Sequence, residues 1–298
     1  MHINSNYLTF ILLFYQKNKL STTIIIQYNM RFFLLFILFL PLLVFSQNIP
    51  FEAGGQNAGM GKSTLAIDQV WAINNNQGGL GYLENPEIGV YYTNRFLMKE
   101  LSSQSFVVAY PTKYGNIGMS IDYFGYSQQS EMQMGLAYAK KFNKYLSLGV
   151  KFDYLQYQQA KEYGNTHTVL AEIGILSHPY ENIFIGAHIY NPSMSKFNTA
   201  IEKSAPTIFS VGMAYIPDPL VKLTAQIDKD LNYAPTYKVG VELNLKELFY
   251  IRSGINISPN AYYLGLGYNF KNIKFDIAFS YQQVLGISPA SSLEYTFK

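Results

Sequence analysis

The sequence contains no cysteine, a single tryptophan and little charge. Among its 298 residues there are 0 Cys, 1 Trp and 4 His, and Asp, Glu, Lys and Arg together make up 14%. The lack of cysteine excludes disulfides, structural thiolate zinc sites and cysteine nucleophiles. The charged share is about half that of an ordinary globular protein. The formal net charge of +3 is too small to indicate a nucleic-acid partner.

Aromatic residues are abundant, and their abundance points to a particular kind of membrane protein. The chain has 26 Tyr and 21 Phe, and hydrophobic residues make up 49%. The mean hydropathy of +0.02 is too low for a bundle of membrane-spanning helices, whereas the low charge is unusual for a soluble domain. A transmembrane β-barrel satisfies both observations, because half of each strand faces lipid and half faces a polar lumen.

The C-terminal segment has the two-residue periodicity of such strands. Over 273–282, large apolar side chains alternate with small or charged ones, which is the pattern of a strand between two different surroundings. The last strand carries Leu293, Tyr295 and Phe297 on one face. An unpaired terminal strand is prone to aggregation, so we expect this strand to pair with the first one and close a barrel.

The same periodicity repeats from residue 87 to the end of the chain. It predicts about 14 strands, an even number as in single-chain bacterial outer-membrane barrels. They are 87–96, 103–111, 115–125, 130–141, 144–158, 166–177, 182–191, 206–216, 219–230, 236–244, 248–258, 261–270, 272–284 and 289–297. Short turns join them on one side and longer loops, such as 192–205, on the other, so the short turns are expected in the periplasm. The predicted fold is an all-β, antiparallel transmembrane barrel over 87–298, in contact with outer-membrane lipid.

Charged residues fall on the strand face that is predicted to point inward. A Lys or Arg on the lipid-facing side would cost about 2–4 kcal/mol near the midplane. The inward set is Lys151, Asp153, Glu172, Lys238, Glu242, Arg252, Lys274, Asp276 and Glu294. Lys238 and Glu242 are expected beside Arg252. Because ion-selective pores usually have a ring of one sign, we interpret this mixed set as a charge network that braces the lumen.

The N-terminal region has the features of a secretory signal. Met30 and Arg31 precede an apolar run over 32–45, which is shorter than the ~20 residues of a membrane-spanning helix. Small residues then provide a cleavage site before Gln47. We therefore predict that 1–46 is a signal region, in which Met30 is the real initiator and 1–29 a wrongly assigned start. The mature chain is expected in the outer membrane.

Residues 47–86 precede the first strand and are predicted to form a plug. Glycine-rich sequence over 54–61 is followed by a short amphipathic helix over 65–76, with Ser63 as its cap. We expect the plug to meet strand glycines such as Gly149 and Gly265, because a glycine in a strand leaves room for another backbone. The predicted plug residues are Leu65, Asp68, Val70, Trp71, Asn76 and Leu80.

No motif for catalysis or for cofactor binding is found. The tetrad 61–64 reads Gly-Lys-Ser-Thr, but a phosphate-binding loop needs a glycine where this chain has Gln56. His167, His178 and His188 are scattered, without the spacing of a metal site or a partner for a serine nucleophile. The sequence therefore predicts a protein that is not an enzyme and that uses no cofactor and no metal.

The order of these features resembles a known family. A glycine-rich segment (53–61) is followed by Ala66-Ile67-Asp68, by the stretch 74–80 with the sequence Asn-Asn-Asn-Gln-Gly-Gly-Leu, and by a first strand that opens at 85–92. This order resembles the PorV/PorQ group of Bacteroidetes outer-membrane proteins, relatives of the FadL fatty-acid channel. The resemblance implies a fourteen-stranded barrel and a part in type IX secretion.

Two functions remain open at this point. The first is an interaction protein, whose partners would be secreted cargo carrying a C-terminal signal domain and other secretion-system subunits. The second is a FadL-like transporter that passes a hydrophobic solute through the lumen and out through a side opening. An apolar pocket behind the plug would favour transport, whereas the predicted inward positions are mainly glycine, serine and paired charges.

Overall fold

The structure is a computed structural model that describes residues 51–159, 164–197 and 205–298. The predicted signal region over 1–46, with Met30, and the predicted mature start at Gln47 lie outside the described residues. Among the described residues, no helix is both long enough and apolar enough to cross a membrane.

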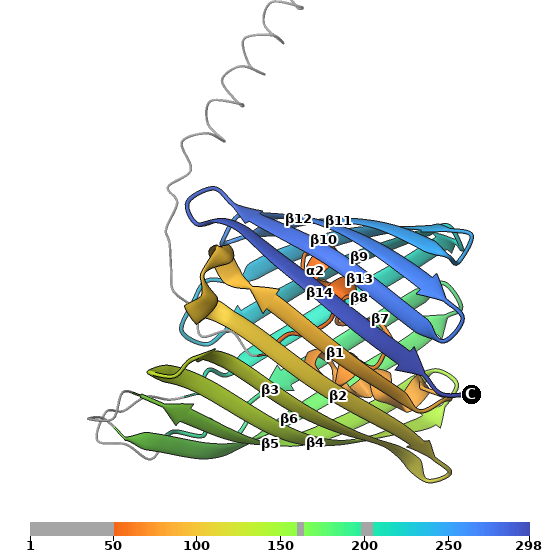
Figure 1. Cartoon of the computed structure of the whole chain (residues 1–298). Coiled ribbons are helices and arrows are strands. Elements are labelled where there is room, and N and C mark those ends of the chain that lie inside the picture. The colour runs from red at the N-terminus through yellow and green to blue at the C-terminus, as the bar shows by residue number, and fades with distance from the viewer. Residues whose placement is uncertain (1–50, 160–163, 198–204) are drawn as a thin grey trace, which may run out of the picture. The chain divides into compact units, whose positions relative to one another are not determined.

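Fourteen antiparallel strands form a closed barrel (Figure 1). The strands are β1 (Glu87–Asn94), β2 (Ser102–Thr112), β3 (Gly115–Tyr126), β4 (Gln129–Asn143), β5 (Leu146–Gln158), β6 (Asn165–Tyr180), β7 (Ile183–Tyr190), β8 (Ile208–Asp218), β9 (Val221–Asp230), β10 (Thr236–Leu245), β11 (Phe249–Ile257), β12 (Ala261–Phe270), β13 (Ile273–Gln282) and β14 (Gly286–Thr296). Each strand pairs with its neighbours in the sequence, and β1 pairs with β14. The predicted fold is confirmed.

The first and last strands close the barrel along their whole common length. Their register runs from Glu87 opposite Thr296 to Thr93 opposite Ala290, and it includes Leu293 and Tyr295. Phe297 follows β14 directly, and its backbone N–H donates to the carbonyl oxygen of Pro86 at 2.9 Å. The ladder therefore leaves no free edge at either terminal strand.

Several strand boundaries differ from the prediction by two or three residues, and the structure explains two of them directly. β1 ends at Asn94 because Phe96 and Leu97 adopt positive φ values of 58° and 59°, which no strand accommodates. The chain there forms two short 3-10 turns, η2 (Arg95–Leu97) and η3 (Lys99–Leu101). β14 begins at Gly286 rather than at 289, since pairing with β13 extends to the tight turn after Gln282.

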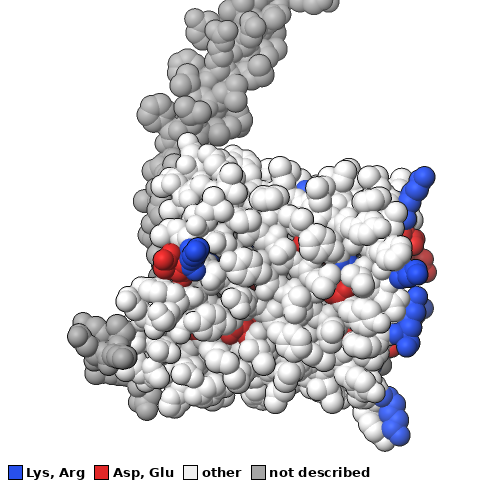
Figure 2. All heavy atoms as spheres, viewed as in Figure 1, with Lys and Arg blue, Asp and Glu red and all other residues white. Residues whose placement is uncertain are grey.

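The outer surface carries an apolar band. Side chains that point outward include Phe152, Leu264 and Leu266, which are exposed by 61%, 63% and 63%. Charged atoms gather mainly at one end of the barrel, where β14 finishes, and the side of the barrel in view is nearly free of them (Figure 2). This is the surface of a barrel that spans a lipid bilayer.

Residues 51–86, which precede β1, lie inside the barrel (Figure 1). It forms α2 (Gly55–Gly59), α3 (Ala72–Asn75) and the 3-10 helix η1 (Gln77–Tyr82). The predicted helix over 65–76 is wrong except for its last turn, and Ser63 caps no helix but donates to the Met60 carbonyl at 2.6 Å. Because walls surround the segment on all sides, it needs no single apolar face.

Candidate functional site

The plug packs tightly against the barrel wall. Val70, Trp71 and Leu80 are fully buried, Leu65 and Asn76 are nearly so, and Asp68 alone among the predicted plug residues is exposed. The Trp71 indole N–H donates to Glu294 Oε1 at 2.7 Å. Its ring meets Tyr91 edge to face, with 6.0 Å between the ring centroids.

Strand glycines make this close approach possible. A Cβ at Gly149 would overlap the backbone of Gln77 in η1, and a Cβ at Gly265 would lie 2.9 Å from the Cα of Gly59 in α2. These two glycines therefore receive the plug, as their positions in the sequence suggested. The plug residues that touch them are Gln77 and Gly59, whereas Leu65 lies against Gly212 and Trp71 against Gly89.

One charge network runs along the inner wall from β10 to β14. Arg252 donates from Nε to Glu242 Oε2 at 2.6 Å and from Nη1 to Asp276 Oδ1 at 2.5 Å. Lys274 Nζ lies 3.5 Å from Glu294 and 3.9 Å from Asp276. We call these five residues the β10–β14 network. Each predicted member lies on the lumen side of its strand.

A second network lies on β5, β6 and β7. Lys151 Nζ is 2.9 Å from Asp153 and 3.3 Å from Glu172, and His188 Nε2 is 3.0 Å from Glu172. All four side chains are at most 7% exposed. We call them the β5–β7 network. The plug contacts it through Gln77, whose side-chain N–H donates to Glu172 Oε2 at 2.6 Å.

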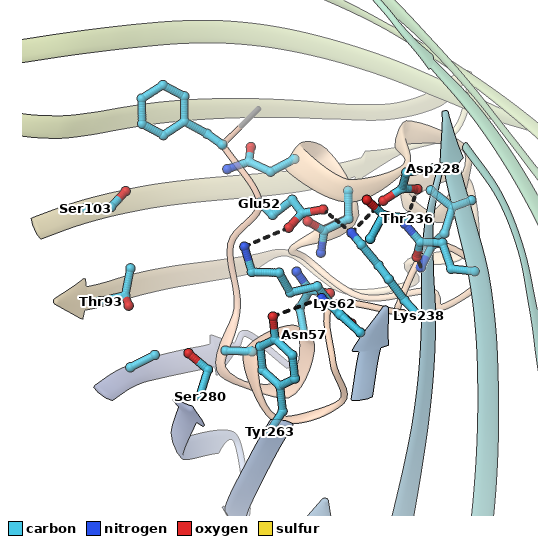
Figure 3. Close-up of a pocket in the computed structure, with 18 of the residues that line it drawn as sticks. Glu52, Asn57, Lys62, Thr93, Ser103, Asp228, Thr236, Lys238, Tyr263 and Ser280 are labelled. Atoms are coloured by element: carbon cyan, nitrogen blue, oxygen red, sulfur yellow. Dashed lines mark hydrogen bonds and ion pairs between the residues drawn. The ribbon is translucent and has the colours of Figure 1, made fainter. Parts of the chain in front are cut away.

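Lys238 belongs to neither network, so its expected place beside Arg252 is wrong. Its Nζ lies 2.7 Å from Glu52 in the plug and 2.6 Å from Asp228 on β9. Glu52 also meets Lys62 Nζ at 3.0 Å, and these four residues form the cavity-floor network (Figure 3). The strand register explains the difference. Lys238 is paired with Gln226 on β9, and the next inward residue of β10, Thr236, is paired with Asp228, so the Lys238 side chain reaches Asp228.

The two plug members of the cavity-floor network hold shifted pKa values. Burial alone would raise the pKa of the Glu52 carboxyl, but the ammonium groups of Lys238 and Lys62 outweigh burial and lower the pKa to about 2. Burial lowers the pKa of the Lys62 ammonium, which the Glu52 carboxylate partly offsets. Glu52 is therefore ionised at neutral pH and ties the plug to β10.

A cavity of about 220 Å³ lies above the cavity-floor network. It faces the end of the barrel where the longer loops lie, and polar strand residues such as Ser103, Thr236 and Ser280 surround it (Figure 3). Its floor comes from the plug, including Asn57 and Lys62. Apolar and aromatic lining is provided by Phe51, Leu65, Tyr91, Phe96, Tyr190, Ile208 and Tyr263. The cavity thus combines apolar surface with charge.

A groove of about 450 Å³ lies in the wall beside this cavity. It crosses β1, β2, β3, β13 and β14, and Ser291 and Tyr92 contribute to it on the lipid-facing side. Tyr91 lines both the groove and the lumenal cavity. The wall between the two spaces is therefore a single strand at Tyr91.

The three histidines considered in the sequence lie in separate surroundings. His178 stacks on Tyr82 at 4.0 Å between ring centroids and His167 stacks on Tyr154 at 5.8 Å, while His188 belongs to the β5–β7 network. Within the described ranges, no group of three or more His, Asp or Glu side chains is arranged to hold a metal ion.

Several important residues were not recognised in the sequence. Glu52, Gln56, Asn74 and Gln77 bind wall carboxylates or ammonium groups, and Lys62 binds Glu52 within the plug. The only available signal was the run of polar residues in a segment predicted to be enclosed, because a buried polar group needs a partner.

The geometry defines a closed fourteen-strand membrane β-barrel with a segment folded into its lumen. Solved structures share this barrel fold. The toluene transporter TbuX of Ralstonia pickettii is 12% identical, with 83% of this chain and 99% of that chain covered and a TM-score of 0.63. The toluene transporter TodX of Pseudomonas putida is 11% identical, with 84% and 98% covered and a TM-score of 0.61.

A FadL homologue of Pseudomonas aeruginosa is also similar, at 11% identity, with 84% of this chain and 99% of that chain covered and a TM-score of 0.56. The expected likeness to FadL-like outer-membrane barrels is confirmed at the level of the fold. No protein-family model matches the sequence, and no curated protein sequence matches it. The structural neighbours named here are transporters rather than enzymes.

Proposed function

We propose that this protein is an outer-membrane transporter of the FadL type that admits a small amphipathic solute. The observation that carries the proposal is the lumenal cavity above the plug, in which aromatic rings and charged groups share one lining. The fold supports it, since structures with this fold include toluene transporters. The solute would enter from the end with the longer loops.

The size of the cavity limits the solute. An apolar cavity of about 150 Å³ holds a benzene molecule, and pockets for drug-sized ligands begin near 300 Å³. At about 220 Å³, the cavity suits a single aromatic ring with one or two polar substituents. The carboxylates and hydroxyls of the lining favour such a substituent, because a ligand without one would leave buried polar groups unpaired.

The route beyond the cavity follows from the plug and the wall. Trp71, Ile73 and Leu80 are fully buried beneath the cavity, so the plug occupies the direct path. The wall at Tyr91 separates the cavity from the lipid-facing groove by one strand. A side exit at this strand requires Tyr91 to move, since the β1–β14 ladder is continuous there.

Emission of the single tryptophan tests the proposal. Tyr91 contacts Trp71 and lines the cavity, so a ring bound beside Tyr91 changes the surroundings of the indole. Titration of the folded barrel with 4-methylphenol is expected to shift Trp71 emission saturably, with a micromolar Kd, or about −8 kcal/mol. Ser280→Phe, which fills the cavity, should abolish the shift.

The matched control is Ser253→Phe, which adds the same ring on the lipid-facing side of β11. It should leave the titration unchanged. A linear, unsaturated response in the parent protein, or the same response in Ser280→Phe, would contradict binding in the cavity.

A second candidate function is the secretion-associated role that the resemblance to PorV/PorQ implies. It is supported by apolar side chains on the loops at the cavity end: Leu97, Met194 and Val284 are exposed by 66%, 58% and 69%. Exposed apolar groups outside the lipid band are typical of protein contacts. If this role is right, a deletion strain should lose surface attachment of cargo with a C-terminal signal domain, and Leu97→Asp with Val284→Asp should reproduce the loss.

A further inference from the structure

Lysines are concentrated in one sector of the barrel end opposite the cavity. Lys113 lies in the β2–β3 turn, Lys144 in the β4–β5 turn and Lys140 near the end of β4. Strands β2 to β5 are consecutive in the barrel, so the two turns are neighbours on the rim. In Figure 2 the charged atoms stand out at this end of the molecule. We call the residues Lys113, Tyr114, Lys140, Phe142, Lys144 and Tyr145 the basic sector.

Aromatic rings accompany these lysines. Lys113 Nζ lies 4.8 Å from the ring centroid of Tyr114, and Lys144 Nζ lies 4.8 Å from that of Tyr145. Tyr114 and Phe142 are exposed by 70% and 59%. The Tyr138 hydroxyl on β4 donates to the carbonyl oxygen of Tyr114 at 2.8 Å, which fixes one turn to the next strand. The sector is thus a defined surface rather than independent loops.

The charge of the basic sector is not neutralised within the described part of the chain. None of Lys113, Lys140 and Lys144 forms an ion pair with a described residue. The other turns of this end differ, with Glu181 after β6, Asp218 before β9, and Lys246 directly beside Glu247. Lys271 in the β12–β13 turn is a further lysine at this end, but among the described turns it is at the rim of β2 to β5 that three lysines come together.

The basic sector lies at the edge of the apolar band, and this position indicates what kind of molecule it binds. Lys140 follows Leu136 and Tyr138 on the lipid-facing side of β4, so its stem lies along the apolar band and its ammonium at the edge of it. Tyrosine and lysine at this level are typical of the zone of lipid headgroups. An anionic headgroup attached to an apolar tail could contact the ammonium groups and the apolar strand surface at the same time.

We propose that the basic sector binds the phosphate headgroup of an anionic phospholipid. Lys113 and Lys144 contact the phosphate from the two turns, and Lys140 contacts it from the wall. The acyl chains lie on the outward faces of β3 and β4, along Ile117 and Leu136, which are exposed by 51% and 63%. This binding does not depend on what the lumen transports.

The test uses the whole barrel in a neutral detergent, titrated with phosphatidylglycerol and observed by native mass spectrometry. A lysine near a lipid surface contributes about a fivefold change in affinity. The triple variant Lys113→Gln, Lys140→Gln, Lys144→Gln is therefore expected to bind about a hundredfold more weakly than the parent. The triple Lys→Arg variant should bind like the parent, since it keeps the charge.

The matched control removes three lysines elsewhere: Lys99→Gln, Lys246→Gln and Lys271→Gln. Its phosphatidylglycerol affinity should equal that of the parent, and phosphatidylcholine should bind weakly to all variants. An equal loss in both glutamine triples would overturn the proposal, because net charge alone would then explain binding. Competition by soluble glycerol phosphate at the same concentration would also overturn it, because the site would then take a phosphate without its lipid.

Discussion

The two large charge networks of the inner wall are compensated in different ways. In the β10–β14 network, Arg252 and Lys274 face Glu242, Asp276 and Glu294, and Lys222 on β9 adds a third cation 3.3 Å from Glu242. Cations and carboxylates are therefore equal in number. In the β5–β7 network, one lysine, Lys151, pairs with two carboxylates, those of Asp153 and Glu172.

The difference shows what the plug contributes to each side. The β5–β7 network takes a neutral donor from the plug, Gln77, and the nearby carboxylate of Asp122 takes another, Asn74, at 2.7 Å. Because these donors carry no charge, they satisfy the carboxylates without adding an ion. The plug donates to the β10–β14 network as well, from Gln56 to Glu242 and from Trp71 to Glu294. Those carboxylates also have wall cations in equal number, so we expect the β3–β7 wall to depend more on the plug than the β10–β14 wall does.

The largest expected effect comes from Arg252→Met, which removes the centre of the self-compensated network. It leaves Glu242 and Asp276 buried without their shared cation, and breaking a buried pair costs about 3–5 kcal/mol. Urea unfolding in lipid vesicles, followed by Trp71 emission, measures the loss. Lys222→Met is the control, because its side chain is 22% exposed and a partly exposed pair contributes about 1 kcal/mol or less.

A smaller effect is expected when the plug is pushed away from the β5–β7 network. Gly149→Ala places a methyl group in the backbone of Gln77, and overpacking costs about 1–3 kcal/mol. Gly265→Ala meets Gly59 at a longer distance on the other wall and should cost less. Equal losses in the same unfolding assay would show that the two walls hold the plug alike.

Matched glutamine changes sharpen the comparison further. Gln77→Leu removes the donor to Glu172, and Gln56→Leu removes the donor to Glu242 at 2.8 Å. A hydrogen bond to a charged group contributes about 1.5–3 kcal/mol. We expect about 2 kcal/mol for Gln77→Leu and about 1 kcal/mol for Gln56→Leu, since Arg252 and Lys222 remain beside Glu242. The reverse order would contradict the dependence of β5–β7 on the plug.

The smallest effect concerns Glu52 and its pH dependence. Glu52→Gln should cost about 1 kcal/mol at pH 7, because the carboxylate then no longer binds Lys62 and Lys238. Its pKa is lowered from 4.5 to about 2, so its stabilisation is complete above pH 4.5 and is lost as the pH falls through 2. Unfolding of both proteins at pH 3 to 8 should show a constant difference above pH 5 and a smaller one at pH 3.

The barrel could be predicted because, within each strand, lipid-facing residues alternate with lumen-facing ones. Alternation such as Leu148, Val150 and Phe152 against Gly149 and Lys151 needs no knowledge of distant residues. Closure could be predicted as well, since the terminal strand around Tyr295 needed a partner. The predicted end of β1 was wrong because Phe96 and Leu97 adopt positive φ values, which the sequence does not indicate.

The plug could not be predicted to the same depth. Its shape depends on the wall around it, and no local period describes contacts such as Gln77 with Glu172. Lys238 was assigned to the wrong partner because its true one, Glu52, lies in the plug. Residues that bind across the lumen are far apart in the chain, so only the completed register brings them together.

Closure by the first and last strands has a consequence for the order of folding. Glu87 and Thr296 are 209 positions apart and yet hydrogen-bonded neighbours. Non-local pairing of this kind is slow, because the chain loses loop entropy before the contact forms. The plug precedes β1 in the chain, and one of its wall partners, the Glu294 carboxylate bound by Trp71, lies on β14. The contacts of the first described segment are therefore complete only when the last strand is in place.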